Sequence, residues 1–263
     1  MQSKNPVFSR SRQQPAGWSA PAPSPDHLQN MYDAPSYAPP SRPAFRTMTL
    51  DDVVVRGFMT LGTLVVAAAA AWYLQVSLAV AIGAAIVALV LGLIASFKMS
   101  TNPVLILSYA VFEGVFLGAL SSAFEARTGG IVLQAVLGTA LAFGGVLAVY
   151  SLRIIRVTPK LVKFVIAAGI AALGLVLVNM VAGIFVDGGL GLREGSMIGY
   201  LFSAAMILLG CFFLLLDFDS IEQGVKQGAP DKFAWQCAFG LTLSLVWIYL
   251  EVLRLVSYFT SSD

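Results

Sequence analysis

The sequence predicts an all-α integral membrane protein, a bundle of seven transmembrane helices. Of its 263 residues, 58% are hydrophobic and only 11% are charged. The apolar residues form blocks of about 17 to 25 residues, which is the length of helix that spans a bilayer. Lipid offers the backbone no hydrogen-bond partners, so a chain that does not close into a barrel crosses it as helices.

The first 48 residues differ in composition from the rest. They hold nine of the twelve prolines and few large aliphatic residues, so they cannot bury enough surface to fold. We expect residues 1–48 to form a disordered, Pro-rich cytoplasmic leader and residues 49–263 to form the transmembrane domain. The stretch PSYAPPSRP also fits a polyproline docking site, although a solvated tail is the simpler interpretation. No apolar core with a cleavage site is present, so the leader is not a signal peptide.

Seven apolar segments follow the leader, and we expect each one to be helical. Only three residues separate the first two segments, which form either a tight hairpin or a re-entrant pair. Six or eight crossings therefore also fit the pattern. The segments are residues 58–74, 78–97, 104–124, 131–152, 161–186, 197–216 and 234–259.

Lysine and arginine near the span ends predict the orientation, because cytoplasmic loops carry an excess of them. Ten lie on one side and three on the other, which places the N-terminus in the cytoplasm and, with seven spans, the C-terminus outside. The ten are Arg42, Arg46, Arg56, Lys98, Arg153, Arg156, Lys160, Lys163, Lys226 and Lys232, and the three are Arg127, Arg193 and Arg254.

The composition also excludes several classes of protein. A net charge of +2 gives no basic face for nucleic acid. The single histidine, His27, lies in the leader, and the last span has no lysine, so neither a histidine-ligated zinc hydrolase nor a retinal protein is expected. Cys211 and Cys237 lie in or beside apolar segments, where we expect free thiols rather than a disulfide.

Three acids fall within the spans: Glu113 in the third, Asp217 at the inner end of the sixth and Glu251 in the outer part of the seventh. A charged group inside a span costs about 2.5–3.5 kcal/mol on insertion scales, so each acid needs a partner or a wet cavity.

Helical spacing predicts where these acids point. The sixth and seventh spans each carry one small, polar stripe, and we expect the two stripes to face each other or a central path. The opposite side of the seventh span is aliphatic and suits lipid. The stripes are Ser203, Gly210, Asp217 and Gly224 on the sixth span and Gly240, Ser244, Trp247, Glu251 and Arg254 on the seventh, and the aliphatic side is Leu241, Leu245, Ile248, Val252 and Leu255.

Structural roles compete with functional ones at most of the acids. Glu251 can pair with Arg254, three residues away, and Glu113 can serve as hydrogen-bonded glue between helices. Asp219 and Glu222 fit the surface, Glu222 by pairing with Lys226 four residues on. Close helix packing is likewise the simpler interpretation of the GxxxG motif in the third span.

Asp217 fits a functional role better, because it lies on the small-residue stripe with no basic residue one turn away. Low dielectric disfavours the charged form of such a carboxyl, so its protonation should respond to pH. When ionised it attracts a cation or repels a neighbouring acid, and when protonated it can close a hydrogen bond. This chemistry suggests a pH-responsive cation gate.

Residues 48–259 resemble the Bax inhibitor family of membrane proteins, in its actinobacterial branch. The resemblance rests on MTLDDVVVRG, YAVFEGVFLGALSSAFE, GIVLQAVLGT, IRVTPK and LDFDSIEQGVKQGAPDKFAWQCAFGLTLSLVWIYLEVLRLVSYF. It implies six helices around a central C-terminal helix. It also implies a calcium leak in the bacterial cytoplasmic membrane that pH gates through two aspartates, one on the sixth and one on the seventh helix.

Asp217 matches the sixth-helix aspartate of the family. With the last helix aligned on residues 253–254, Ser244 stands where the second aspartate is expected. Glu251 lies on the same stripe but about 10 Å further along the axis, and Glu113 could instead reach the site from the third span. Which of these acids, if either, replaces the second aspartate stays open.

The leading hypothesis is therefore a pH-sensitive calcium or cation leak channel, gated by protonation of Asp217. Calcium prefers six to eight oxygen ligands, so we expect Asp217 to be only a weak candidate site for partly hydrated calcium, and we expect no resident cofactor. The ion-binding and pH-gating candidates are Asp217, Glu113, Glu251 and Ser244, supported by Arg254, Asp219 and Glu222.

The alternative is an interaction protein that modulates a membrane protease or a stress response without ion flux. The GxxxG motif and the leader fit this class. An intramembrane aspartyl protease needs two carboxylates about 3 Å apart that share a proton, and the last span has no aspartate, so we expect no enzyme. The expected partners are membrane lipid, cations and protons, with a membrane protein under the alternative and no nucleic acid.

Overall fold

The computed structural model describes residues 24–26, 29, 46–186 and 188–260. The chain divides into two compact units, residues 1–44 and 45–263. Only residues 24–26 and 29 of the first unit are described, so most of the predicted leader and His27 lie outside the described residues. The second unit contains all the candidate site residues.

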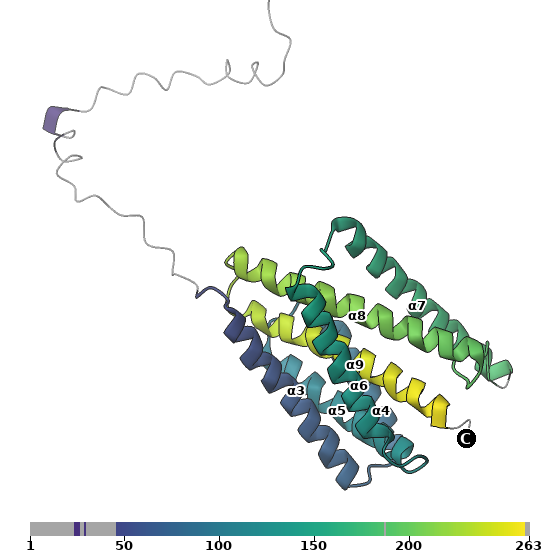
Figure 1. The fold of residues 1–263 in the computed structure, drawn as a ribbon. Coiled ribbons are helices and arrows are strands. Elements are labelled where there is room, and N and C mark those ends of the chain that lie inside the picture. Colours follow the sequence, from purple (N-terminus) through teal and green to yellow (C-terminus); the bar gives the residue numbers. More distant parts are fainter. Residues whose placement is uncertain (1–23, 27–28, 30–45, 187, 261–263) are drawn as a thin grey trace, which may run out of the picture. The chain divides into compact units, whose positions relative to one another are not determined.

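Within its described residues, the second unit consists of seven long α-helices, which confirms the all-α membrane fold (Figure 1). Each is long and apolar enough to cross a membrane, and the described residues include no β-strand. The helices are α3 (Leu50–Tyr73), α4 (Leu78–Phe97), α5 (Pro103–Glu125), α6 (Ile131–Ser151), α7 (Pro159–Phe185), α8 (Met197–Lys226) and α9 (Phe233–Thr260).

Two helices run beyond the apolar segments that predicted them. Helix α3 begins eight residues before residue 58 because Thr49 and Asp52 form a capping box, in which each side chain accepts a hydrogen bond from the other residue's backbone N–H. Helix α8 continues ten residues past residue 216 and ends before Gly228, whose φ is +66°. The whole stretch LLLDFDSIEQGV is therefore helical, because polarity ends the apolar run without breaking the helix.

Helix α9 lies at the centre of the bundle (Figure 1). It packs directly against α3, α5, α6 and α8, while α4 packs against α5 and α7 against α8. Phe239 of α9 reaches the cluster formed by Ala88 and Ala95 of α4. Trp247 packs against the cluster that α7 shares with α8. The last helix thus packs directly on four helices, and its side chains join the clusters that contain residues of the other two, α4 and α7.

Part of the aliphatic side of α9 faces protein rather than lipid, so the prediction was wrong for Ile248 and Val252. Leu241 and Leu245 of the same side are half-buried and line an apolar cavity. Ile248 is fully buried, and it packs in one cluster with Val252, with Leu214 of α8 and with Ile131 of α6. The helical pattern alone cannot distinguish a lipid-facing side from a buried one, because both are apolar. These side chains are buried because α9 lies at the centre of the bundle, with other helices packed against it.

A short segment before α3 is bound to the turn between α8 and α9. The Met48 backbone N–H donates to the Ala229 carbonyl at 2.8 Å, and the Asp231 N–H donates to the Arg46 carbonyl at 2.9 Å. Met48 is only 2% exposed. Residues 46–48, at the end of the predicted leader, therefore contact the turn between α8 and α9, and Met48 packs in a cluster with residues of α3, α8 and α9.

The GxxxG motif of α5 serves close packing against α3. A Cβ atom on Gly114 would lie 2.8 Å from the Ala67 Cβ and closer still to the Leu64 carbonyl oxygen. One on Gly118 would overlap the Ala68 backbone. The two glycines let the helix backbones approach each other, as the structural interpretation of this motif predicted.

Candidate functional site

The carboxylate of Asp217 lies in the contact between α8 and α9. The Ser244 hydroxyl of α9 donates a hydrogen bond to Asp217 Oδ2 at 2.5 Å. A Cβ atom built on Gly240, one turn before Ser244, would lie 2.9 Å from Asp217 Oδ1. The carboxylate therefore rests over Gly240, and a side chain at position 240 would force it to shift.

The polar stripes of α8 and α9 face each other, as their spacing predicted. Gly210, two turns before Asp217, lies against Trp247 and Ile248 of α9. The Trp247 indole N–H donates to the Met206 carbonyl of α8 at 3.0 Å. Asp217 is thus held on the α9 side of α8, inside the bundle rather than toward lipid.

Asp217 has no cationic partner in the part of the chain that the structure describes. The ion pairs found there join Arg46 with Asp52, Arg56 with Asp231, Lys226 with Glu222, and both Arg193 and Arg254 with Glu251. A neutral hydroxyl does not compensate the negative charge of an ionised carboxylate as a neighbouring cation would. The charge at Asp217 therefore depends directly on protonation.

Ser244 occupies the position that the family resemblance assigned to a second aspartate, and it does lie opposite Asp217. The site is therefore a carboxylate and a hydroxyl rather than a pair of carboxylates. A hydroxyl can both donate and accept a hydrogen bond, so Ser244 can pair with Asp217 whether the acid is ionised or protonated.

Glu251 belongs to a separate cluster near the other end of α9. Its Oε1 atom lies 2.7 Å from Arg254 Nη1 and 3.8 Å from Arg193 Nη2. The Glu251 side chain is only 6% exposed. Two arginines thus compensate Glu251, and the structural ion pair with Arg254 that the spacing allowed is present.

Sequence reasoning missed Arg193 as a partner of Glu251. It lies between α7 and α8, close to glycines with positive φ at positions 188, 189 and 191. Burial, together with the neighbouring Arg254 guanidinium, lowers the pKa of Arg193. Loops of this kind have no periodicity, so no spacing rule connects position 193 with position 251.

Glu113 is half-buried on α5 and lies within electrostatic range of Tyr109 on the same helix. Within the described residues it has no hydrogen bond to another side chain and no ion pair. The structure does not bring it into contact with Asp217.

The other two acids of LLLDFDSIEQGV have surface partners. The Gln223 amide donates to Asp219 Oδ2 at 2.5 Å. Glu222 accepts one hydrogen bond from Lys226 and another from the Tyr150 hydroxyl of the neighbouring helix α6. The predicted pair of Glu222 and Lys226 is present, with Tyr150 as an additional partner.

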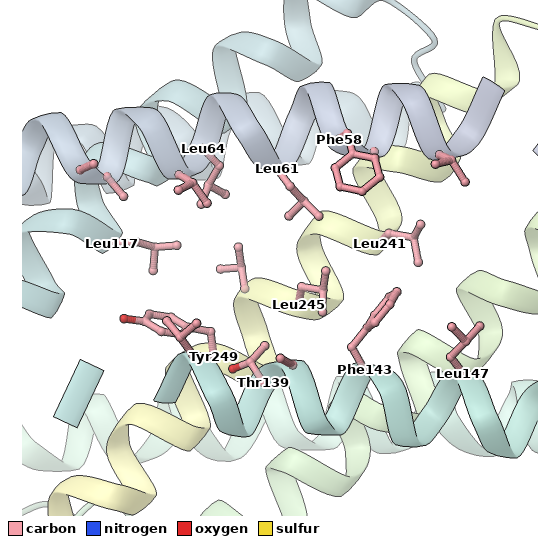
Figure 2. Close-up of a pocket in the computed structure, with 18 of the residues that line it drawn as sticks. Phe58, Leu61, Leu64, Leu117, Thr139, Phe143, Leu147, Leu241, Leu245 and Tyr249 are labelled. Carbon is pink, nitrogen blue, oxygen red and sulfur yellow. The ribbon is translucent and has the colours of Figure 1, made fainter. Parts of the chain in front are cut away.

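A large apolar cavity lies beside the site without including it. It has a volume of about 990 Å³ and runs between α3 and α6, over side chains of α5 and α9 (Figure 2). Leu241 and Leu245 point into it from α9, and the hydroxyl of Tyr249, hydrogen-bonded to Ser121 at 2.6 Å, lies at one end. None of the candidate acids lines it. The cavity suits an apolar occupant rather than an ion.

The described residues contain no group of three or more His, Cys, Asp or Glu side chains close enough together to hold a metal ion. Cys211 and Cys237 are free thiols. A cation at Asp217 would meet one carboxylate and one hydroxyl from the protein. It would keep most of its water, since calcium prefers six to eight oxygens.

Fold and site together define a multi-pass, all-helical membrane protein with a single carboxylate held between its last two helices. The chain belongs to the Bax inhibitor 1 like family, whose model matches residues 5–261. This match confirms the resemblance inferred from the sequence, and it extends further toward the N-terminus than residue 48. No curated protein and no solved structure gives a significant match to the chain.

Proposed function

We propose that this protein is a pH-sensitive leak channel for calcium or related cations, and that protonation of Asp217 gates it. The observation that carries the proposal is the position of the Asp217 carboxylate. It lies between the two most polar helix stripes, with a neutral hydroxyl as its hydrogen-bond donor and no cation beside it in the described chain. Intramembrane acids in such surroundings commonly mark ion or proton pathways.

The proposed direction of gating follows from there being one carboxylate rather than two. Ionised Asp217 has no neighbouring acid to repel in the contacts described above, so its negative charge acts on cations. Protonated Asp217 is neutral and loses this attraction. Flux should therefore rise as the pH rises through the titration of Asp217.

Calcium is the cargo in this proposal and not a resident cofactor. Asp217 and Ser244 together supply at most three oxygens, so the ion passes weakly bound and partly hydrated. Weak binding is compatible with conduction, because a permeating ion has to leave the site as readily as it enters.

We also propose that the protein lies in the bacterial cytoplasmic membrane with its N-terminus in the cytoplasm. The excess of Lys and Arg on one side of the bundle supports this orientation. The inner end of α8, with Asp217, then faces the cytoplasm.

The test is calcium flux into liposomes that contain the purified protein, measured with an entrapped indicator at pH values from 5.5 to 8.5. We expect flux above that of protein-free liposomes, increasing with pH. Protein-containing liposomes that pass no more calcium than empty ones at every pH would contradict the channel.

A second candidate is an interaction protein that binds another membrane protein and conducts no ions. The apolar cavity in Figure 2 favours it, because a cavity of about 990 Å³ between α3 and α6, lined by apolar side chains, could receive side chains of a partner helix. Crosslinking in native membranes tests it. A stoichiometric partner, combined with the absence of flux from the isolated protein, would support this function instead of the leak.

A further inference from the structure

A second cavity lies at the Lys- and Arg-rich end of the bundle and shares no lining residue with the apolar cavity of Figure 2. Its volume is about 700 Å³, within the usual size range of ligand pockets. Three parts of the chain line it: α3 through Arg56, the turn between α4 and α5 through residues 98–103, and the beginning of α9 through Asp231, Lys232 and Trp235.

The cavity has an excess of positive charge. Arg56 is compensated, because its guanidinium donates to both the backbone carbonyl and the carboxylate of Asp231, the latter at 3.3 Å. It also lies 5.7 Å from the centre of the Trp235 ring. Lys98 and Lys232 are exposed and make no ion pair with any acid in the described parts of the chain. Two positive charges at the cavity therefore have no counter-charge.

Neutral hydrogen-bond donors complete the lining. The Ser100 hydroxyl accepts a hydrogen bond from the Asn102 backbone N–H at 3.2 Å, which leaves its own proton free to donate. The Thr101 hydroxyl also lines the cavity. Two ammonium groups next to hydroxyl donors match the oxygens of a phosphate group, which accepts several hydrogen bonds and carries negative charge.

The surroundings of the cavity suggest where such a phosphate would come from. Phe97 and Met99, on either side of Lys98, are 84% and 65% exposed, as expected for side chains that enter the bilayer beside a cation. Trp235 is a residue type enriched at the membrane interface. Basic pockets between transmembrane helices on the cytoplasmic side are suited to anionic lipid headgroups.

We propose that the cavity between Lys98, Lys232 and Arg56 binds a phosphate group, carried either by an anionic phospholipid at the membrane surface or by a soluble phosphate compound. This site is independent of Asp217, so it stands whether or not the protein conducts ions.

The test uses the full-length protein in a neutral detergent and measures its unfolding temperature by intrinsic fluorescence. Three additions are compared at equal ionic strength: phosphatidylglycerol, phosphatidylcholine and inorganic phosphate. We expect phosphatidylglycerol to raise the unfolding temperature more than phosphatidylcholine does. An equal rise with inorganic phosphate would identify a site for soluble phosphate, whereas a rise with phosphatidylglycerol alone would identify a lipid headgroup site.

The variant that tests the location is K98Q/K232Q, with K160Q/K163Q as the matched control. The control removes two exposed lysines from the first two turns of α7, on the same side of the bundle but outside the cavity. The cavity variant should lose most of the ligand-induced rise, while the control should keep it. Equal rises in the wild type and both variants would overturn the proposal, as would a wild type that neither phosphatidylglycerol nor phosphate stabilises. Native mass spectrometry of retained phosphatidylglycerol provides a second readout that does not depend on the variants' own stability.

Discussion

At the scale of single residues, Asp217 differs from Glu251 and Glu222 in what it contacts. Glu251 and Glu222 each have a cationic partner, whereas the hydrogen-bond donor of Asp217 is the Ser244 hydroxyl. A cation beside an acid compensates the negative charge of its ionised form. An acid paired only with a neutral hydroxyl leaves a net negative charge at the site when it is ionised and none when it is protonated. A pH gate needs such a change of charge.

Removing that hydroxyl in S244A should move the midpoint of calcium flux to higher pH. The Ser244 hydroxyl stabilises ionised Asp217 by donating a hydrogen bond to it. Without this donor, the protonated form of Asp217 is favoured up to a higher pH. The expected displacement is about one to two pH units, since a hydrogen bond to a charged group contributes about 1.5–3 kcal/mol and one unit corresponds to about 1.4 kcal/mol. Liposome flux across pH measures it. S151A is the control, because the Ser151 hydroxyl bonds only to its own helix at Ala148; a midpoint that is the same in wild type and S244A would exclude the hydrogen bond from gating.

Gly240 should tolerate no side chain, because the space for its Cβ is taken by Asp217 Oδ1. We expect G240A to lower the free energy of unfolding by about 1–3 kcal/mol, as overpacking of a well-packed contact does. G144A is the matched control on α6, where a Cβ atom would meet nothing within 4 Å. Unfolding of the purified variants in detergent gives the comparison, and equal stability of the two variants would argue against the close contact at Gly240.

The residue-scale prediction from sequence succeeded where helical periodicity applied. The seven-residue spacing of Ser203, Gly210, Asp217 and Gly224 identified the side of α8 that faces α9, because every helix of this pitch brings such positions to one face. Periodicity could not identify Arg193, which lies in a loop. Periodicity also could not decide whether Glu113 contacts Asp217, since that depends on how α5 and α8 are placed in three dimensions.

At the scale of helices, the two halves of α9 make different contacts. One half packs against Asp217 of α8, and the other binds the loop before α8. The half that contains Gly240 and Ser244 holds Asp217. The half that contains Glu251 and Arg254 receives Arg193 from the loop between α7 and α8. The first contact leaves a carboxylate without a cation, and the second fixes a loop to the central helix.

Replacing Glu251 should therefore affect stability rather than pH sensing. E251Q leaves Arg193 and Arg254 close together without their acid, and removing one partner of a buried pair costs about 3–5 kcal/mol. E222Q is the control, because a partly exposed pair such as Glu222 with Lys226 contributes about 0–1 kcal/mol. We expect a large loss of unfolding free energy in E251Q alone. A pH profile of flux that changes in E251Q while stability does not would assign the sensing role to Glu251 instead.

Helix existence was predictable from the sequence, but the ends and the surroundings of the helices were less so. The apolar segments predicted all seven helices, because lipid forces long apolar runs into that conformation. Helix α8 extended further than its apolar run, since the polar residues after residue 216 are still compatible with a helix. The sequence could not distinguish the buried positions Ile248 and Val252 of α9 from lipid-facing ones, because lipid and a protein interior both favour the same residues.

At the scale of the whole molecule, the central position of α9 connects the site to the rest of the bundle. Helix α9 packs against α3, α5, α6 and α8, so a change in the contact at Asp217 acts on a helix that four others contact directly. The segment at residues 46–48 also joins the start of α3 to the turn before α9. A protonation step at one side chain thus has a direct structural connection to several helices.

The proposed orientation places the beginning of α3 and the turn between α8 and α9 in the cytoplasm. Single cysteines introduced at Arg153 or Lys232 in a C211A/C237A background should be protected from a membrane-impermeant thiol reagent in intact cells. A cysteine at Arg127, between α5 and α6, should react. The reverse pattern of labelling would contradict the orientation.

The most direct test of the account is calcium flux through D217N in liposomes, measured beside the wild type at each pH. Asparagine has nearly the shape of aspartate but cannot ionise, so it resembles the protonated acid at every pH. We predict a low flux in D217N that no longer rises with pH, while the wild type rises. A D217N profile that follows the wild type across the same range would show that Asp217 is not the group whose proton controls the channel.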